Sequence, residues 1–198
     1  MTVPPKLILA SKSASRRAML DGVGLKYRAI PADLDERAIG DKFADDPKKM
    51  ATELARQKAL AVAKDYPDAL VIGSDSLVAM DGKIFNKAGS PQEAVQKLLT
   101  LSGKTHYLIS AVAVATGGVI LWDSCDNAAM TMRNFDQTFA RNYVAKIGDA
   151  AMDCVGAYQL EALGPWLFEN IEGDYFTILG MPLVQLLGYL QDYHEVTL

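Results

Sequence analysis

Hydroxyl and guanidinium groups gather directly after the first apolar segment of the chain. The stretch LILASKSASRRAML places Ser11 and Ser13 just before Arg16 and Arg17, where a helix-like apolar pattern begins. Free N–H groups at a helix start attract phosphate, and arginine adds paired hydrogen bonds to phosphate oxygens. The pattern therefore predicts an anion site. A simpler interpretation carries equal weight, in which Ser13 caps the helix and both arginines lie in solvent.

Two further charged residues stand in apolar surroundings. Lys58 follows Leu54 by four residues, on the apolar stripe of a predicted helix. It either extends along that helix to water or reaches into an anionic site, and its position alone favours the first. Asp75 closes the strand-like segment ALVIGSD, where a buried carboxylate needs a partner or a function. At a strand end it could bind Mg²⁺, accept a proton from water or cap a turn, and Lys87 could return to the same place.

Other polar residues give weaker indications of a catalytic or metal-binding role. Asp33, Asp35 and Glu36 lie in a charge-rich segment, where solvation is the expected state. His106 and His194 accompany no nucleophile motif, so we assign them no catalytic role. The two cysteines lack metal-ligand spacing.

The composition excludes several classes of protein. The chain has 198 residues and a net charge of −4, which disfavours nucleic-acid binding through the phosphate backbone. No stretch approaches the ~20 apolar residues of a membrane helix, and no signal-peptide pattern is present. We therefore expect a cytoplasmic protein without membrane contact.

Apolar periodicity and turn residues predict an α/β protein whose sheet contains parallel and antiparallel pairs. Expected strands are 6–10 and 69–75, a hairpin turning at Asp81-Gly82, and two long strands joined at Gly117-Gly118. Expected helices are 13–23, 47–64, 90–103, 135–148 and 181–193. Segment 27–47 is expected to be a surface loop.

Three blocks of this chain resemble the Maf family, in the family's order and over nearly the whole length. They are LILASKSASRRAML, GSDSLVAMDGKIFNKAGSPQEAVQKLLTLSGKTH and VGAYQLEALGPWLFENIEGDYFTILGMPL. The resemblance implies an α/β fold of the inosine-triphosphatase-like type, a mixed β-sheet with flanking helices and two lobes around a central cleft. It also implies that residues 1–198 form a single domain.

The resemblance further implies a nucleoside triphosphate pyrophosphatase, which cuts between the α and β phosphates and needs a divalent metal, Mg²⁺ or Mn²⁺. Asp75 would then accept a proton from water, and Glu36 and Asp75 would contact the metal. The positions that would hold the triphosphate are Ser11, Arg16, Arg17, Lys58 and Lys87. The residues alone do not choose a pyrophosphatase over a phosphatase or kinase.

Some positions depart from the usual family pattern and bear on the base. Ser15 stands where many members carry a large side chain, and Ser76 replaces the Thr or Gln of two branches. The family's GKP is NKA here, at 86–88. Glu161 matches the branch acting on 7-methylguanosine triphosphate, whereas the thymidine and uridine triphosphate branch has Gln. A carboxylate can accept from the N1–H and amino group of guanine, so Glu161 favours a guanine-type base.

The expected function is therefore removal of noncanonical or modified nucleotides, a house-cleaning activity of 7-methyl-GTP type. Two alternatives stay open: a dTTP/UTP pyrophosphatase, and a nucleotide-binding regulator of cell division with little turnover. The expected partner is the nucleoside triphosphate substrate. No binding to nucleic acid is expected, and the expected assembly is either a monomer or a homodimer.

Overall fold

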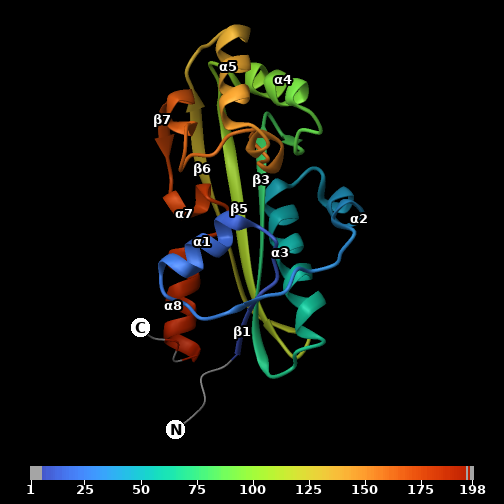
Figure 1. The fold of residues 1–198 in the computed structure, drawn as a ribbon. Helices are drawn as coiled ribbons and strands as arrows, with labels where there is room; N and C mark the ends of the chain where they lie inside the picture. Colours follow the sequence, from blue (N-terminus) through green and yellow to red (C-terminus); the bar gives the residue numbers. More distant parts are fainter. Residues whose placement is uncertain (1–5, 195, 197–198) are drawn as a thin grey trace.

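The computed structural model describes residues 6–194 and residue 196 as a seven-stranded mixed sheet with helices on both faces (Figure 1). The strands are β1 (Lys6–Leu9), β2 (Arg28–Ala29), β3 (Ala69–Met80), β4 (Lys83–Phe85), β5 (Thr105–Thr116), β6 (Val119–Met132) and β7 (Phe168–Glu172). The α-helices are α1 (Ala14–Gly22), α2 (Glu36–Gly40), α3 (Pro47–Ala63), α4 (Pro91–Leu101), α5 (Gln137–Ile147), α6 (Ala150–Asp153), α7 (Tyr175–Ile178) and α8 (Leu183–His194). Two 3₁₀ turns, Asp41–Phe43 and Gly164–Leu167, complete the elements.

The strand order leaves one gap in the pairing of β3. The order is β2-β1-β3-β5-β6-β7, with β1 parallel to both of its neighbours and the remaining pairs antiparallel. One edge of β3 pairs with β5 over Val71–Ala79. The other edge pairs with β1 over Ala69–Ile72 and with β4 over Val78–Met80. Among the described residues, no strand covers that second edge between these two segments, over 73–77.

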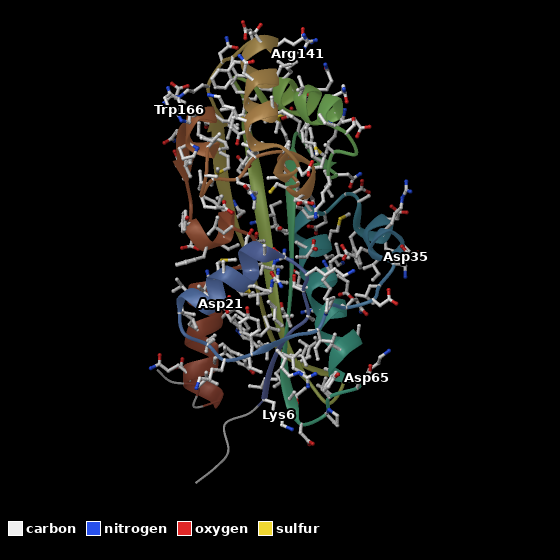
Figure 2. All side chains as sticks on the ribbon, viewed as in Figure 1. Lys6, Asp21, Asp35, Asp65, Arg141 and Trp166 are labelled. Carbon is white, nitrogen blue, oxygen red and sulfur yellow. The ribbon has the colours of Figure 1, made fainter. Side chains whose placement is uncertain are left out.

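Three buried apolar clusters surround the sheet. Helix α3 packs on one face of its lower half, and α1 and α8 pack on the opposite face (Figure 1). Successive side chains of β1 point to opposite faces of the sheet, which separates the two clusters. Ile8 points to the α3 side, while Leu7 and Leu9 point to α1 and α8. A third cluster joins the far ends of β5 and β6 to α4 and α5. Arg141 and Trp166 lie at that end of the molecule and Lys6 lies at the other (Figure 2). We call the end with the third cluster the upper lobe and the end with Lys6 the lower lobe.

Most predicted elements are confirmed, because their end signals are local. Ser13, Asp46 and Ser90 each accept a hydrogen bond from the backbone N–H three residues on, as N-caps do. The terminal helix is confirmed as well, and Leu186 and Leu190 of its apolar face are fully buried. No helix in the described part of the chain is long and apolar enough to cross a membrane.

Two expectations were wrong. Segment 27–47 is not only loop, since it contains β2, α2 and a 3₁₀ turn; Asp35 caps α2 by accepting from the N–H of Ala38. Asp75 does not end its strand, because the apolar residues after it continue β3 along β5 and into the hairpin with β4. Asp75 instead lies mid-strand, within the stretch that lacks a neighbour on one edge.

Candidate active site

A large cleft opens where β3 lacks its second neighbour, between the two lobes. Its volume is about 1500 Å³, and its walls come from the start of α1, segment 31–44, α3, the β3–β4 hairpin and segment 153–161. Nine predicted site residues line it: Ser11, Ser15, Arg16, Glu36, Lys58, Asp75, Ser76, Lys87 and Glu161. Arg17 is exposed and is not among the lining residues.

Lys58 joins two carboxylates at the centre of the cleft. Its Nζ lies 2.6 Å from Asp75 Oδ1 and 3.0 Å from Glu36 Oε1. The side chains of Lys58 and Asp75 are only 10% and 9% exposed, whereas that of Glu36 is 55% exposed. Lys58 therefore does not extend to water, and Asp75 has the partner that its burial requires. Glu36, expected to be solvated, contacts the same ammonium from the cleft rim.

A close backbone contact sets the distance between Lys58 and Asp75. Gly73 lies under α3, where an added Cβ would be 2.1 Å from the carbonyl oxygen of Ala55 and 2.5 Å from the N of Ala59. Any larger residue would push the helix away from the strand. Lys58 lies between Ala55 and Ala59, so this close approach brings its turn of α3 near β3, where Asp75 stands two positions after Gly73.

Arg16 is buried in the floor of the cleft and is held by three groups. Its Nε donates to Gly180 O at 2.9 Å, its Nη2 to Ser76 Oγ at 3.1 Å, and its Nη1 to Ser11 Oγ at 3.4 Å. Burial lowers the pKa of the Arg16 guanidinium, and the charges of Asp75 and Glu36 oppose that change. A guanidinium stays protonated at neutral pH, so the floor carries a fixed positive charge.

The segment after α7 is fastened to the centre of the sheet, which fixes the carbonyl that holds Arg16. Thr177 O accepts from Ser110 Oγ at 2.7 Å, and Thr177 Oγ1 lies 3.0 Å from Asp126 Oδ2. Ser74 Oγ lies 2.9 Å from Gly180 O. Ser74, Ser110 and Thr177 are fully buried. The sequence did not mark these residues, since buried serine and threonine hydroxyls carry no pattern of their own.

Ser11 and Ser13 combine capping with contact to the site. Ser11 Oγ lies 3.2 Å from the N of Ser13, and Ser13 Oγ accepts from the N–H of Arg16. The simpler interpretation is thus right for Ser13 and for Arg17, while Arg16 turns inward. One residue along a helix rotates a side chain by about 100°, which separates the two arginines.

The cleft also contains cations that the sequence did not single out. Lys12, Arg37 and Lys83 line it, and all three are exposed. The only indication of Lys12 in the sequence is its position between Ser11 and Ser13. Cys154 lines the cleft too, but burial raises the pKa of its thiol to about 11, so it is protonated at neutral pH and is no nucleophile.

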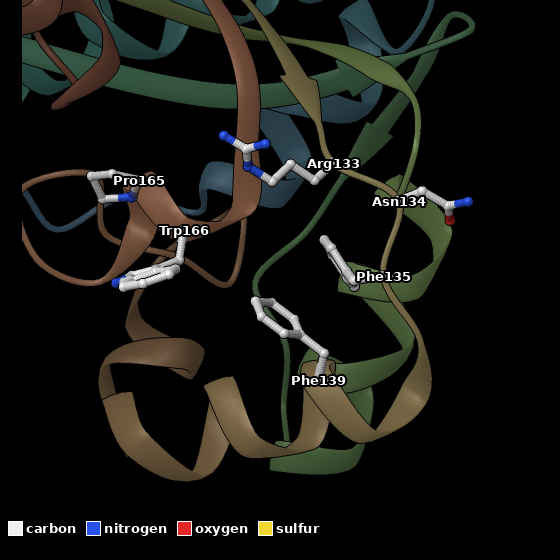
Figure 3. Close-up of a pocket in the computed structure, with 6 residues that line it drawn as sticks. All are labelled: Arg133, Asn134, Phe135, Phe139, Pro165 and Trp166. Atoms are coloured by element: carbon white, nitrogen blue, oxygen red, sulfur yellow. The ribbon is translucent and has the colours of Figure 1, made fainter.

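A second hollow, of about 490 Å³, lies at the upper end of the molecule (Figure 3). Phe135, Phe139, Pro165 and Trp166 form its walls, with Arg133 at the rim. It contains no carboxylate, whereas the large cleft combines carboxylates, cations and hydroxyls. The cleft is therefore the candidate active site.

Comparisons with known proteins relate this chain to a family. The 7-methyl-GTP pyrophosphatase of Rhizobium etli is 43% identical over 95% of this chain and 96% of its own. The nucleoside triphosphate pyrophosphatase of Granulibacter bethesdensis is 42% identical over 97% and 99%. The structure of a HAM1 protein from Coxiella burnetii aligns with 65% of this chain and 73% of its own, at 17% identity and a TM-score of 0.43. The model of the Maf-like protein family matches residues 6–193, and this chain belongs to that family.

Proposed function

We propose that this chain is a nucleoside triphosphate pyrophosphatase, releasing a nucleoside monophosphate and pyrophosphate. The observation that carries the proposal is the buried Lys58–Asp75 pair beside Arg16 in one cleft. Family membership and relatives named as pyrophosphatases support it. A binding protein could hold a triphosphate with cations alone, whereas a buried carboxylate among them suits an acid–base step.

In this mechanism Asp75 accepts a proton from the attacking water. The water oxygen bonds to the α-phosphorus as the bond to the bridging oxygen breaks, and pyrophosphate leaves with the electron pair. Asp75 Oδ1 contacts Lys58, which leaves the second carboxylate oxygen for the water. Lys58 shares its charge between Asp75 and the phosphates, so it holds the base and the substrate together.

The triphosphate is held by Ser11, Arg16, Lys58 and Lys87, all of which line the cleft. Arg16 is fixed by its three hydrogen bonds, so its charge needs no reordering when the substrate arrives. Arg17 lies outside the proposed contacts because it does not line the cleft. We add Lys12 as a further candidate for a phosphate oxygen, since it stands beside Ser11 on the same wall.

The donor set suits Mg²⁺ or Mn²⁺ that arrives with the substrate. Asp75 and Glu36 both reach Lys58 Nζ, so their carboxylates converge on one small region. No group of three or more His, Cys, Asp or Glu side chains in the described chain forms a ready metal cage. Mg²⁺ is commonly bound by one or two carboxylates together with substrate phosphates and water. When bound, the metal would neutralise phosphate charge, and Asp75 and Glu36 would hold it.

Three cleft residues are candidates to contact the base, Ser15, Ser76 and Glu161. Ser76 Oγ also accepts from Arg16, whereas Glu161 is exposed to any bound base. We propose a guanine-type base, with Glu161 accepting from its N1–H and amino group. Several relatives at 43–44% identity carry the name 7-methyl-GTP pyrophosphatase, which supports this choice. A cytoplasmic location and a homodimer stay predictions.

The test is pyrophosphate release from a panel of nucleoside triphosphates with Mg²⁺, including 7-methyl-GTP, GTP, dTTP and UTP. We expect turnover with pyrophosphate, not phosphate, as the product. Bound nucleotide without turnover of any substrate would instead favour the regulator.

Glu161→Gln tests the base contact. An amide presents a donor where guanine also presents one, and such a mismatch costs about 1–3 kcal/mol once the bound base excludes water from the contact. The ratio of kcat/KM for 7-methyl-GTP over dTTP should fall by roughly tenfold to a hundredfold. An unchanged ratio would show that Glu161 does not read the base.

A further inference from the structure

A buried histidine–tyrosine pair lies beside the cleft and has no part in the proposed chemistry. His106 of β5 is fully buried, and its Nε2 lies 2.8 Å from Tyr158 Oη. Burial lowers the pKa of His106 to about 4, so the imidazole is neutral at physiological pH. Its other nitrogen, Nδ1, has no hydrogen-bond partner in the described part of the chain. An apolar residue would avoid that unsatisfied atom, so the distinct contribution of histidine here is the bond to Tyr158.

The backbone around Tyr158 adopts a conformation that needs external support. Ala157 has φ +60°, in the left-handed region that a residue with a Cβ rarely adopts. Gly156 allows the tyrosine ring to fold back, because an added Cβ would lie 2.3 Å from Tyr158 Cε1. The ring then meets Phe168 edge-on, with centroids 5.0 Å apart. The turn Gly156–Tyr158 is therefore held from within the upper lobe.

This turn leads directly to Glu161, the residue proposed to read the base. Tyr158 and Glu161 both line the cleft and are three residues apart. Three backbone bonds of the segment are local: Ala157 donates to Cys154, and Ala162 and Gly164 both donate to Gln159. The Tyr158 side chain reaches further, since it connects the middle of the segment to β5.

We propose that Tyr158 is a positioning residue, whose hydrogen bond to His106 fixes the distance between β5 and the segment carrying Glu161. Base selectivity then depends on this bond although neither ring takes part in the hydrolysis. The inference rests on the proposed function, because it assigns Glu161 to the base. His106 and Tyr158 act on selectivity through Glu161, while Asp75 and Lys58 lie elsewhere in the cleft and are unaffected.

The experiment uses Tyr158→Phe, which keeps the ring and removes the hydroxyl. The ratio of kcat/KM for 7-methyl-GTP over dTTP should fall by about three- to tenfold, the worth of one hydrogen bond. The fall should come from KM, with kcat within about twofold of wild type. His106→Leu should give the same loss, and His106→Gln, which can still bond to the hydroxyl, should recover part of it.

Leu98→Ala is the matched control for lost stability. Leu98 is fully buried in the same apolar cluster and does not line the cleft. This variant should melt at a lower temperature than wild type and keep the wild-type ratio. A ratio that falls equally in Leu98→Ala would overturn the inference, because a general loss of packing in the upper lobe would then be enough to change base selectivity. An unchanged ratio in Tyr158→Phe would also overturn it.

Amide hydrogen exchange of the free protein supplies a readout that needs no turnover. Tyr158→Phe should raise exchange over 154–162 by about tenfold relative to the rest of the upper lobe, whereas Leu98→Ala should raise both alike. Exchange that stays at the wild-type level overturns the inference. If the wild type cleaves no triphosphate, the proposed function fails, and the exchange result still decides whether the pair holds the turn.

Discussion

Replacing Lys58 by methionine probes the ion pair at the centre of the cleft. Methionine keeps a long apolar stem on α3 and removes the charge, which leaves the Asp75 carboxylate buried. Breaking a buried pair by removing one partner costs about 3–5 kcal/mol. Arg16 also acts electrostatically with Asp75, so we expect the lower end, about 3 kcal/mol. For a chain of this size that loss corresponds to a fall in Tm of about 6–12 °C.

The assay is urea unfolding at neutral pH, with the free energy of unfolding taken from the transition. Lys48→Met is the control, because Lys48 is exposed on the first turn of the same helix; its change should stay within about 0.5 kcal/mol. Adding Asp75→Asn to Lys58→Met should restore stability, since the unpaired charge is then gone. Loss of less than about 1 kcal/mol in Lys58→Met would refute a buried ion pair in solution.

Three other changes give separate tests. Asp75→Asn should lower kcat by roughly 10²–10⁴-fold while the affinity for a nonhydrolysable triphosphate survives, and near-normal turnover would remove Asp75 as the base. Lys87→Ala should weaken binding of that triphosphate more than binding of the monophosphate, as titration calorimetry can measure; equal losses would argue against a phosphate contact. His106 has a folded pKa of about 4 against about 6.5 unfolded, so the unfolded chain binds more protons between these values and stability falls as the pH falls. From pH 7 to pH 4 wild type should lose about 3 kcal/mol more than His106→Leu does, and parallel pH profiles would contradict the buried neutral imidazole.

The sequence predicts the helices well because their limits depend on neighbours in the chain. Ser13, Asp46 and Ser90 each cap the helix that follows within three residues, so a local pattern suffices. The length of β3 was missed for the opposite reason. Whether the strand continues beyond Asp75 depends on pairing with β5, from Ser76 with Ser110 to Ala79 with Tyr107, far apart along the chain.

The candidate site was predictable in its residue types and only partly in its geometry. From the sequence, the Lys58 side chain could extend to solvent or into an anionic site. The close approach of α3 to β3 at Gly73 decides between the two. Arg16 and Arg17 are equivalent in the sequence, but only Arg16 faces Gly180 O. A backbone carbonyl has no sequence signature, so this contact could not be foreseen.

The bond between Arg16 Nε and Gly180 O joins positions 164 residues apart. During synthesis, the arginine emerges first and stays solvated until the segment after α7 has left the ribosome. Contacts of such long sequence separation form late, because the intervening chain must be ordered before they are gained. The phosphate cradle is therefore completed only after the segment that carries Gly180 has been synthesised and folded. A chain that stops before Gly180 lacks the carbonyl that orients Arg16, so nucleotide binding reports that synthesis and folding have both passed this residue.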